Sequence, residues 1–209
     1  MSVPQKVLAR LNRIKRGVPF PIDSFYELGS ETSVQKAFSR LVKKGIVARV
    51  SKGFYARPKP LPSPSLPSIK TTASANEVAR AWAKKHGYKL VSQGLESAYR
   101  LGFQTQAPMK AVYWSDGPSR RFKVGNEIVE VKHRSPVQLR WEGKPEGALL
   151  RGLSVTPAET VEMNTLTTAF KRLSLTGSTA KSVIHKLLES PLPKLWQMKL
   201  ESFERTLPQ

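Results

Sequence analysis

The sequence predicts an α+β protein, because helical and strand-like patterns occupy different stretches of the chain. Apolar residues recur at helical spacing in the N-terminal third, over 74–85 and 95–101, and again from 148 onward. Runs with a period of two, interrupted by glycine-containing turns, lie at 46–57 and 109–132. Strands joined by such short turns pair antiparallel. We therefore expect a mainly antiparallel sheet and a helical C-terminal end.

The first 57 residues have the pattern of three helices and a hairpin. Helices are expected over 2–17, where Ser2 is a cap and Pro4 lies in the first turn, over 21–28, and over 30–45. A short strand at 18–20 can pair with the hairpin of 46–57. This order is the layout of a winged helix-turn-helix domain, in which the third helix enters the major groove and the hairpin tip contacts the DNA backbone or minor groove.

The third helix has one apolar face and one polar face. Val34, Ala37, Phe38 and Leu41 share the apolar face, and only one acid, Glu31, accompanies the polar face. Hydroxyl, amide and basic side chains can hydrogen-bond to base edges or phosphates. The candidate DNA contacts, with two hairpin residues last, are Thr32, Ser33, Gln35, Lys36, Ser39, Arg40, Lys43, Arg49 and Lys52.

Charge also favours a nucleic-acid partner. The 209 residues carry a net charge of +20, with a pI near 10.5. Residues 1–57 hold 12 bases and 3 acids, whereas 71–209 hold 21 and 12, so the N-terminal part is the more basic per residue. No apolar run approaches the ~20 residues that span a bilayer, and the N-terminus lacks a signal-peptide pattern. We expect double-stranded DNA as partner, no membrane, and a cytoplasmic location.

A proline-rich stretch predicts the domain boundary. Five prolines lie between Pro58 and Pro67, and such a density excludes a helix or a central strand. We expect an extended, semi-rigid linker over 58–70, rising about 3.1 Å per residue. The predicted domains are therefore 1–57 and 71–209.

Enzymatic chemistry has weak support in the sequence. Asp116 followed by Glu130-Val131-Lys132 could belong to a magnesium-dependent nuclease. However, Asp116 begins a turn, and the same pattern fits a hairpin with charged outer positions. The histidines at 86, 133 and 185 lack metal-ligand spacing, and the absence of cysteine excludes disulfides and thiolate sites. We expect no enzyme, no catalytic residues, no metal and no cofactor.

Residues 37–55 resemble the signature of AbiEi-type antitoxins. This signature has a helix with a small-x-x-Arg-Leu core, matched by Arg40 and Leu41, then Lys44-Gly45, and a wing that ends in Gly-x-Tyr at Tyr55. Residues 94–106 and 113–120 resemble the second domain that accompanies the winged domain in AbiEi-like transcriptional regulators. The likeness covers about residues 1–140.

The resemblance implies the antitoxin of a type IV toxin–antitoxin system. Such an antitoxin binds inverted repeats in its own promoter, represses it, and counteracts a cognate nucleotidyltransferase toxin, with the second domain contributing to neutralisation. Two monomers or a weak dimer could occupy the repeats. The alternatives are a stand-alone repressor of the same architecture and an RNA-binding or nuclease-like protein that uses the C-terminal domain.

Overall fold

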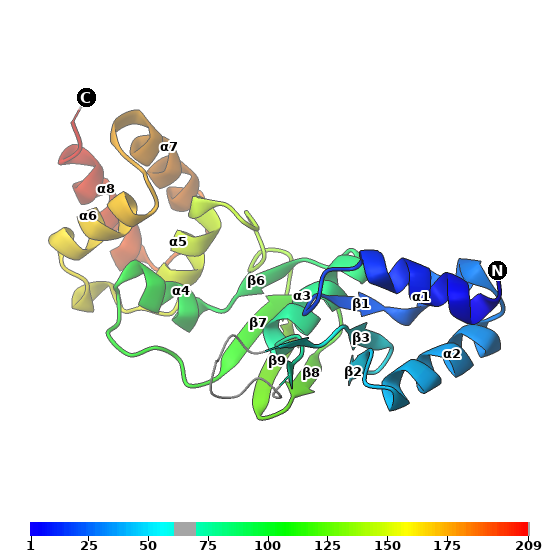
Figure 1. Ribbon diagram of the computed structural model, residues 1–209. Helices are drawn as coiled ribbons and strands as arrows, with labels where there is room; N and C mark the ends of the chain where they lie inside the picture. The colour runs from blue at the N-terminus through cyan, green and yellow to red at the C-terminus, as the bar shows by residue number, and fades with distance from the viewer. Residues whose placement is uncertain (61–69, 209) are drawn as a thin grey trace. The chain divides into compact units, whose positions relative to one another are not determined.

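The computed structural model describes residues 1–60 and 70–208, and it has the α+β class expected from the sequence (Figure 1). The helices are α1 (Val3–Arg13), η1 (Ile22–Leu28), α2 (Glu31–Lys43), α3 (Ala75–His86), α4 (Gly94–Leu101), α5 (Pro145–Leu153), η2 (Ala158–Thr160), α6 (Met163–Arg172), α7 (Gly177–Leu188) and α8 (Lys194–Arg205), where η marks a 3₁₀ helix. The strands are β1 (Pro19–Pro21), β2 (Ala48–Ser51), β3 (Phe54–Ala56), β4 (Lys59–Pro60), β5 (Lys70–Thr71), β6 (Leu90–Ser92), β7 (Ala111–Ser115), β8 (Arg120–Val124) and β9 (Glu127–His133).

The described strands form three sheets. Their orders are β1-β3-β2, β4-β5 and β6-β7-β9-β8. Each pair with an assigned register, namely β1–β3, β2–β3, β4–β5 and β6–β7, is antiparallel. These pairs agree with the expected antiparallel character.

The chain divides into two compact units. Unit 1 contains Met1–Tyr88 and Arg120–Glu130, and unit 2 contains Lys89–Ser119 and Val131–Gln209. This division does not follow the expected boundaries at 57 and 71, because α3 and β8 belong to the same unit as the N-terminal elements.

Side-chain packing explains why α3 belongs to unit 1. Trp82 of α3 is 1% exposed, and its ring centroid lies 5.5 Å from that of Phe122 on β8. Lys85, also on α3, forms an ion pair with Asp23 of η1, and its Nζ lies 5.7 Å from the centroid of the Phe54 ring on β3. These apolar and ionic contacts could not be assigned from sequence spacing.

A cluster of aromatic rings forms the core of the N-terminal elements. The ring centroid of Phe38 lies 5.1 Å from Phe25, 6.2 Å from Phe20 and 4.9 Å from Tyr55. One ring from α2 therefore contacts η1, β1 and β3, so burial of apolar surface holds the helices and the hairpin together. Other buried members of this core are Val7, Leu11, Val34, Ala37, Leu41 and Val47.

The first helix ends earlier than the sequence predicted. We expected it to run to Gly17, but α1 ends at Arg13. The Arg57 guanidinium explains the early end, because its Nη1 donates to the carbonyl oxygens of Leu11 and Ile14 at 3.0 and 2.8 Å. A distant side chain thereby satisfies carbonyl groups at the helix end.

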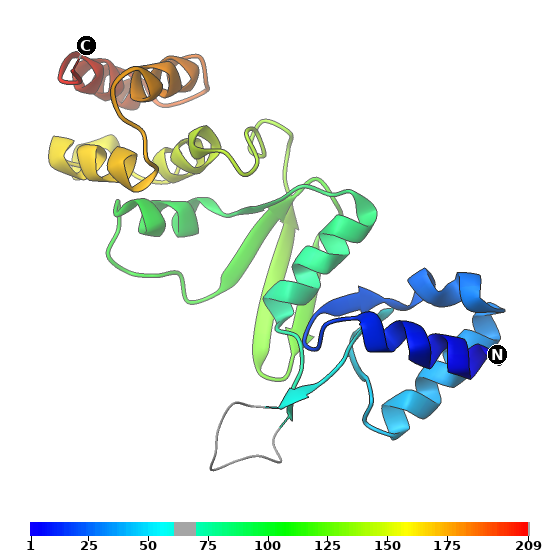
Figure 2. The same cartoon turned by 45° about the horizontal axis from the view of Figure 1, so that its top comes forward.

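The helices of unit 2 pack in tiers. Figure 2 shows α7 and α8 on one side of α5 and α6, with α4 on the other side. Gly152 of α5 permits close approach to α4, since a Cβ at this position would lie 2.8 Å from Cδ1 of Leu101. The largest fully buried side chains of this core include Trp196, Phe170 and Phe203. The helix α5 begins at Pro145, three residues before position 148, where the helical pattern of the C-terminal region was expected to begin.

The expected linker lies largely outside the described residues. The two ends of this stretch, Lys59–Pro60 and Lys70–Thr71, pair as β4 and β5, and 61–69 are not described. In the described ranges, no helix has the length and apolar character needed to cross a bilayer.

Candidate nucleic-acid interface

The helix α2 is built from strong local signals. The Ser30 hydroxyl oxygen accepts a hydrogen bond from the backbone N–H of Ser33 at 3.4 Å, which caps the N-terminus. Gly45 follows the C-terminal end with a φ of +65°, in the left-handed region. Between these ends, the face with Val34 and Phe38 is buried. The apolar stripe therefore fixes which face of α2 points outward.

The structure places the nine candidate contact residues on the outer side of α2 and on the β2–β3 hairpin. Ser33 is half-buried, and the other eight are exposed. On α2, Lys36, Arg40 and Lys43 follow one another at spacings of four and three residues, so they form one edge of the exposed face. We call the nine residues the basic face. They are Thr32, Ser33, Gln35, Lys36, Ser39, Arg40, Lys43, Arg49 and Lys52.

The cations of the basic face have no acidic partners among residues 1–60 and 70–208. None of Lys36, Arg40, Lys43, Arg49 and Lys52 forms an ion pair there. Residues 1–57 nevertheless contain three acids, so the absence of ion pairs depends on which side chains these acids contact.

The three acids of 1–57 have partners other than the cations of the basic face. Glu27 pairs with Arg10 and Asp23 pairs with Lys85. Glu31 accepts a hydrogen bond from the Gln35 amide nitrogen at 3.0 Å. Glu31 is therefore the one carboxylate of 1–57 that hydrogen-bonds to a residue of the basic face, and it bonds to the neutral Gln35 amide rather than to a cation. The five cations keep an excess of positive charge on this side of unit 1.

Two residues of the basic face already have local partners. The Gln35 amide also donates to the Tyr26 hydroxyl at 3.3 Å, so both of its N–H groups are used and its carbonyl oxygen is left. The Ser33 hydroxyl oxygen accepts from the Ser30 hydroxyl at 2.8 Å. Sequence spacing could not reveal these bonds, and they make both residues weaker candidates for base contacts than Ser39 or Arg40.

The hairpin presents its two cations on a short, anchored turn. Arg49 lies opposite Tyr55 in the β2–β3 register, and Lys52 lies in the turn before Gly53, which has a φ of +77°. The backbone N–H of Ile22 donates to the Gly53 carbonyl at 2.9 Å, so the turn is tied to the start of η1. Arg49 and Lys52 are both exposed.

One exposed base of this region was missed in the sequence. Lys44 is exposed directly after α2, and the Lys43-Lys44 pair in the sequence was the signal for it.

The Asp116 carboxylate, considered above for a nuclease, accepts a hydrogen bond from the backbone N–H of Lys89 at 2.8 Å. Within the part of the chain that the structure describes, no three His, Asp or Glu side chains are grouped to hold a metal ion.

Sequence comparison gives a family assignment. Residues 6–176 match a family of unknown function, DUF6088. The chain belongs to this family. The DUF6088 match begins within α1 and ends before α7, so it includes the basic face and parts of both units but not α7 and α8. No curated protein matches the chain.

Proposed function

We propose that this DUF6088 protein is a sequence-specific DNA-binding regulator. In this proposal, α1, η1, α2 and the β2–β3 hairpin act as a winged helix-turn-helix, with α2 as the recognition helix. The observation that carries the proposal is the basic face, whose five cations are exposed and unpaired in the described residues. Such a concentration of uncompensated charge favours a polyanion.

The dimensions of α2 suit the major groove. A helix of 13 residues is about 20 Å long, and the major groove is about 12 Å wide and admits an α-helix. Ser39 and Arg40 lie in the C-terminal half of α2, and both side chains are exposed and can reach base edges. Lys36 and Lys43 flank them and suit phosphate contacts, which set position rather than specificity.

The hairpin would supply a second, backbone contact. Its turn carries Lys52 at the tip and is tied to η1 through Gly53, so Lys52 is presented from a fixed turn. A cation in this position suits the phosphates or the minor groove beside the site of α2.

The resemblance of residues 37–55 to AbiEi-type antitoxins extends the proposal. The protein would repress its own promoter at inverted repeats, as a monomer or weak dimer in the cytoplasm, and would counteract a nucleotidyltransferase toxin. Co-expression with the product of the neighbouring open reading frame tests this part. Relief of growth inhibition supports an antitoxin, and a neighbour without toxicity leaves a stand-alone repressor.

DNA binding is tested with duplexes from the region upstream of the gene. Fluorescence anisotropy over a range of salt concentrations would compare the wild type with Arg40→Ala and Lys52→Ala. We expect Arg40→Ala to weaken binding by about 1–3 kcal/mol and to relax sequence specificity, as for loss of a base contact. We expect Lys52→Ala to weaken binding and to reduce the slope of log affinity against log salt by about 0.9, as for loss of a phosphate contact. Lys6→Ala is the matched control, because Lys6 is an exposed cation on α1, which carries no residue of the basic face.

Four results would contradict the proposal. Unchanged affinity and slope in both variants would mean that the basic face is not the contact surface. An equal loss in Lys6→Ala would indicate non-specific attraction. Tighter binding to structured RNA than to duplex DNA, or metal-dependent cleavage that Glu130→Ala abolishes, would favour the RNA-binding or nuclease-like alternative.

A further inference from the structure

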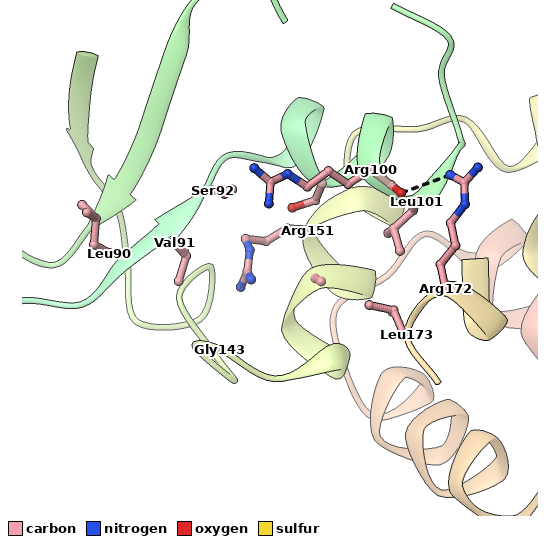
Figure 3. Close-up of a pocket in the computed structure, with 11 residues that line it drawn as sticks. Leu90, Val91, Ser92, Arg100, Leu101, Gly143, Arg151, Arg172 and Leu173 are labelled. Carbon is pink, nitrogen blue, oxygen red and sulfur yellow. Dashed lines mark hydrogen bonds between the residues drawn. The ribbon is translucent and has the colours of Figure 1, made fainter. Parts of the chain in front are cut away.

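Unit 2 contains a pocket lined by three arginines. Its volume is about 400 Å³, within the range of pockets that hold small molecules. Strand β6, helices α4 and α5 and the C-terminal end of α6 contribute its walls (Figure 3). Arg100, Arg151 and Arg172 line it together with apolar side chains such as Val91 and Leu101, and no acid is among its lining residues in the described chain.

Arg151 is the most unusual of these residues. It is only 5% exposed, and its Nη1 donates to the Arg140 carbonyl oxygen at 3.3 Å. Its Nε is buried and has no hydrogen-bond partner in the described part of the chain. A buried charged donor without an acceptor is costly, and native proteins keep such groups mainly where something else completes them.

The charge of Arg151 persists at neutral pH. Burial lowers the pKa of its guanidinium to about 10, and the negative charge of Glu142 acts in the opposite direction. Glu142 forms no ion pair with Arg151, and its carboxylate accepts from the backbone N–H of Leu90 at 2.9 Å. The guanidinium therefore stays protonated and lacks a direct anionic partner within the described residues.

Arg100 adds a second cation at the same end of the pocket. Figure 3 shows the guanidinium groups of Arg100 and Arg151 on the same side of α4, whereas Arg172 points the other way. The Arg100 Nε donates to Glu96 at 2.6 Å, which leaves its terminal nitrogens available. Arg172 donates from Nη1 to the Arg100 carbonyl oxygen at 3.1 Å, so it supports the backbone that carries Arg100.

We propose that this pocket binds a phosphorylated small molecule, with its phosphate between Arg151 and Arg100. A phosphate beside Arg151 would supply an anionic partner for its buried guanidinium, and guanidinium groups match phosphate through paired hydrogen bonds. Ser92 and Ser97 also line the pocket and offer hydroxyl groups. The apolar walls at Val91 and Leu101 suit the uncharged part of the ligand.

This site is independent of the proposed DNA contact. Its lining residues all belong to unit 2, whereas the basic face belongs to unit 1. The test therefore contains no DNA, and its failure would leave the proposed function unaffected.

The experiment is a thermal-shift titration of the full chain with inorganic phosphate and with ribose 5-phosphate, at constant ionic strength. Ligand binding to the folded state raises the melting temperature in a saturable way. We expect saturation with both probes and tighter binding of ribose 5-phosphate. Arg100→Gln should weaken binding about tenfold, because it removes a charge-assisted hydrogen bond. Arg205→Gln, which changes an exposed cation on α8, should leave binding unchanged.

Other outcomes overturn the proposal. No saturable shift with either probe would exclude a phosphate site. If Arg205→Gln weakened phosphate binding as much as Arg100→Gln, the effect would come from the overall charge of the protein and not from the pocket. A further titration uses succinate, a dicarboxylate. Saturable binding of succinate without binding of phosphate would mean that the pocket binds a carboxylate and not a phosphate. Arg151→Lys is a second variant that keeps the buried charge, and it should also weaken binding because an ammonium group cannot make the paired hydrogen bonds of a guanidinium. If its circular dichroism is native and phosphate still binds with wild-type affinity, Arg151 is not the anion contact.

Discussion

Phe38 is the residue through which α2 is attached to the rest of unit 1. Its side chain is fully buried and contacts three other aromatic rings. Phe38→Ala should lower the free energy of unfolding by about 3–5 kcal/mol, since the surrounding rings come from different elements and cannot fill the cavity. Urea unfolding followed by fluorescence measures this change.

Val42→Ala is the control for Phe38→Ala, because Val42 lies on the same helix and is 38% exposed. Its cost should stay within about 0.5 kcal/mol. Equal losses in the two variants would mean that core packing at Phe38 does not account for the effect, since alanine is the better helix former at both positions.

Glu146 makes stability depend on pH. Its side chain is 9% exposed and accepts a hydrogen bond from Lys186 Nζ at 2.6 Å. This bond lowers the pKa of the Glu146 carboxyl below its ordinary value, against the opposing effect of burial. A carboxyl whose pKa is lower in the folded state stabilises the fold above its unfolded pKa of about 4.3, and this contribution is lost as pH falls through the folded pKa.

Glu146→Gln should therefore cost about 1–2 kcal/mol at pH 7, and the difference from the wild type should shrink as pH falls below about 4. Thermal unfolding at a series of pH values measures it. Glu189→Gln makes the same change at an exposed position, directly after α7, and should have little effect on stability. A difference that grows toward low pH would contradict the assigned role of the pair.

Single residues were predictable from the sequence only where a periodic pattern determined their exposure. The stripe of Val34 and Phe38 determines that Arg40 faces outward, so the basic face could be predicted. The engagement of Gln35 by Tyr26 and the burial of Arg151 could not, because both depend on side chains that meet only in the folded chain.

The N-terminus of α3 has a strong capping signal in the sequence. Ser74 accepts from the backbone N–H of Glu77 at 3.1 Å, and the Glu77 carboxylate accepts from the backbone N–H of Ser74 at 2.7 Å. This reciprocal capping box satisfies two donors that a helix otherwise leaves unpaired. At the start of α2, Ser30 makes the longer bond of 3.4 Å, and residue 33 is serine rather than Glu.

Ser74→Ala should thus cost about 1 kcal/mol, and Ser30→Ala should cost less. Chemical denaturation of both variants makes the comparison within one unit of the fold. A larger loss in Ser30→Ala would show that bond geometry at the cap does not decide the cost.

Elements were predictable where capping signals and glycines bounded them. The range of α3 and the two turns at Gly87 and Gly102 follow such signals, and both glycines are left-handed as a helix end favours. The early end of α1 depends on Arg57, more than 40 residues away in the chain. The start of α5 was also missed, because Gly147 and Gly152 dilute its apolar pattern although both permit close packing.

At the scale of the whole molecule, the division into units was the least predictable feature. Composition changes at the prolines and suggested a boundary there, but Trp82 packs on Phe122 across about 40 positions of sequence and draws α3 and β8 into unit 1. Aromatic packing between distant segments leaves no periodic trace in the sequence.

The net charge of +20 raises the question of whether DNA attraction is local or spread over the molecule. If the basic face is the contact, neutralising Lys36, Arg40, Lys43, Arg49 and Lys52 together should reduce the slope of log affinity against log salt by about 4, since each of the phosphate contacts among them contributes about 0.9. A variant with Lys89, Lys110, Lys171, Lys194 and Arg205 neutralised removes the same charge from exposed positions of unit 2. It should change the slope by less than about 1, because unbound charges release no counterions. Equal slopes in the two variants would instead assign binding to the overall positive field, and the recognition role of α2 would then be wrong.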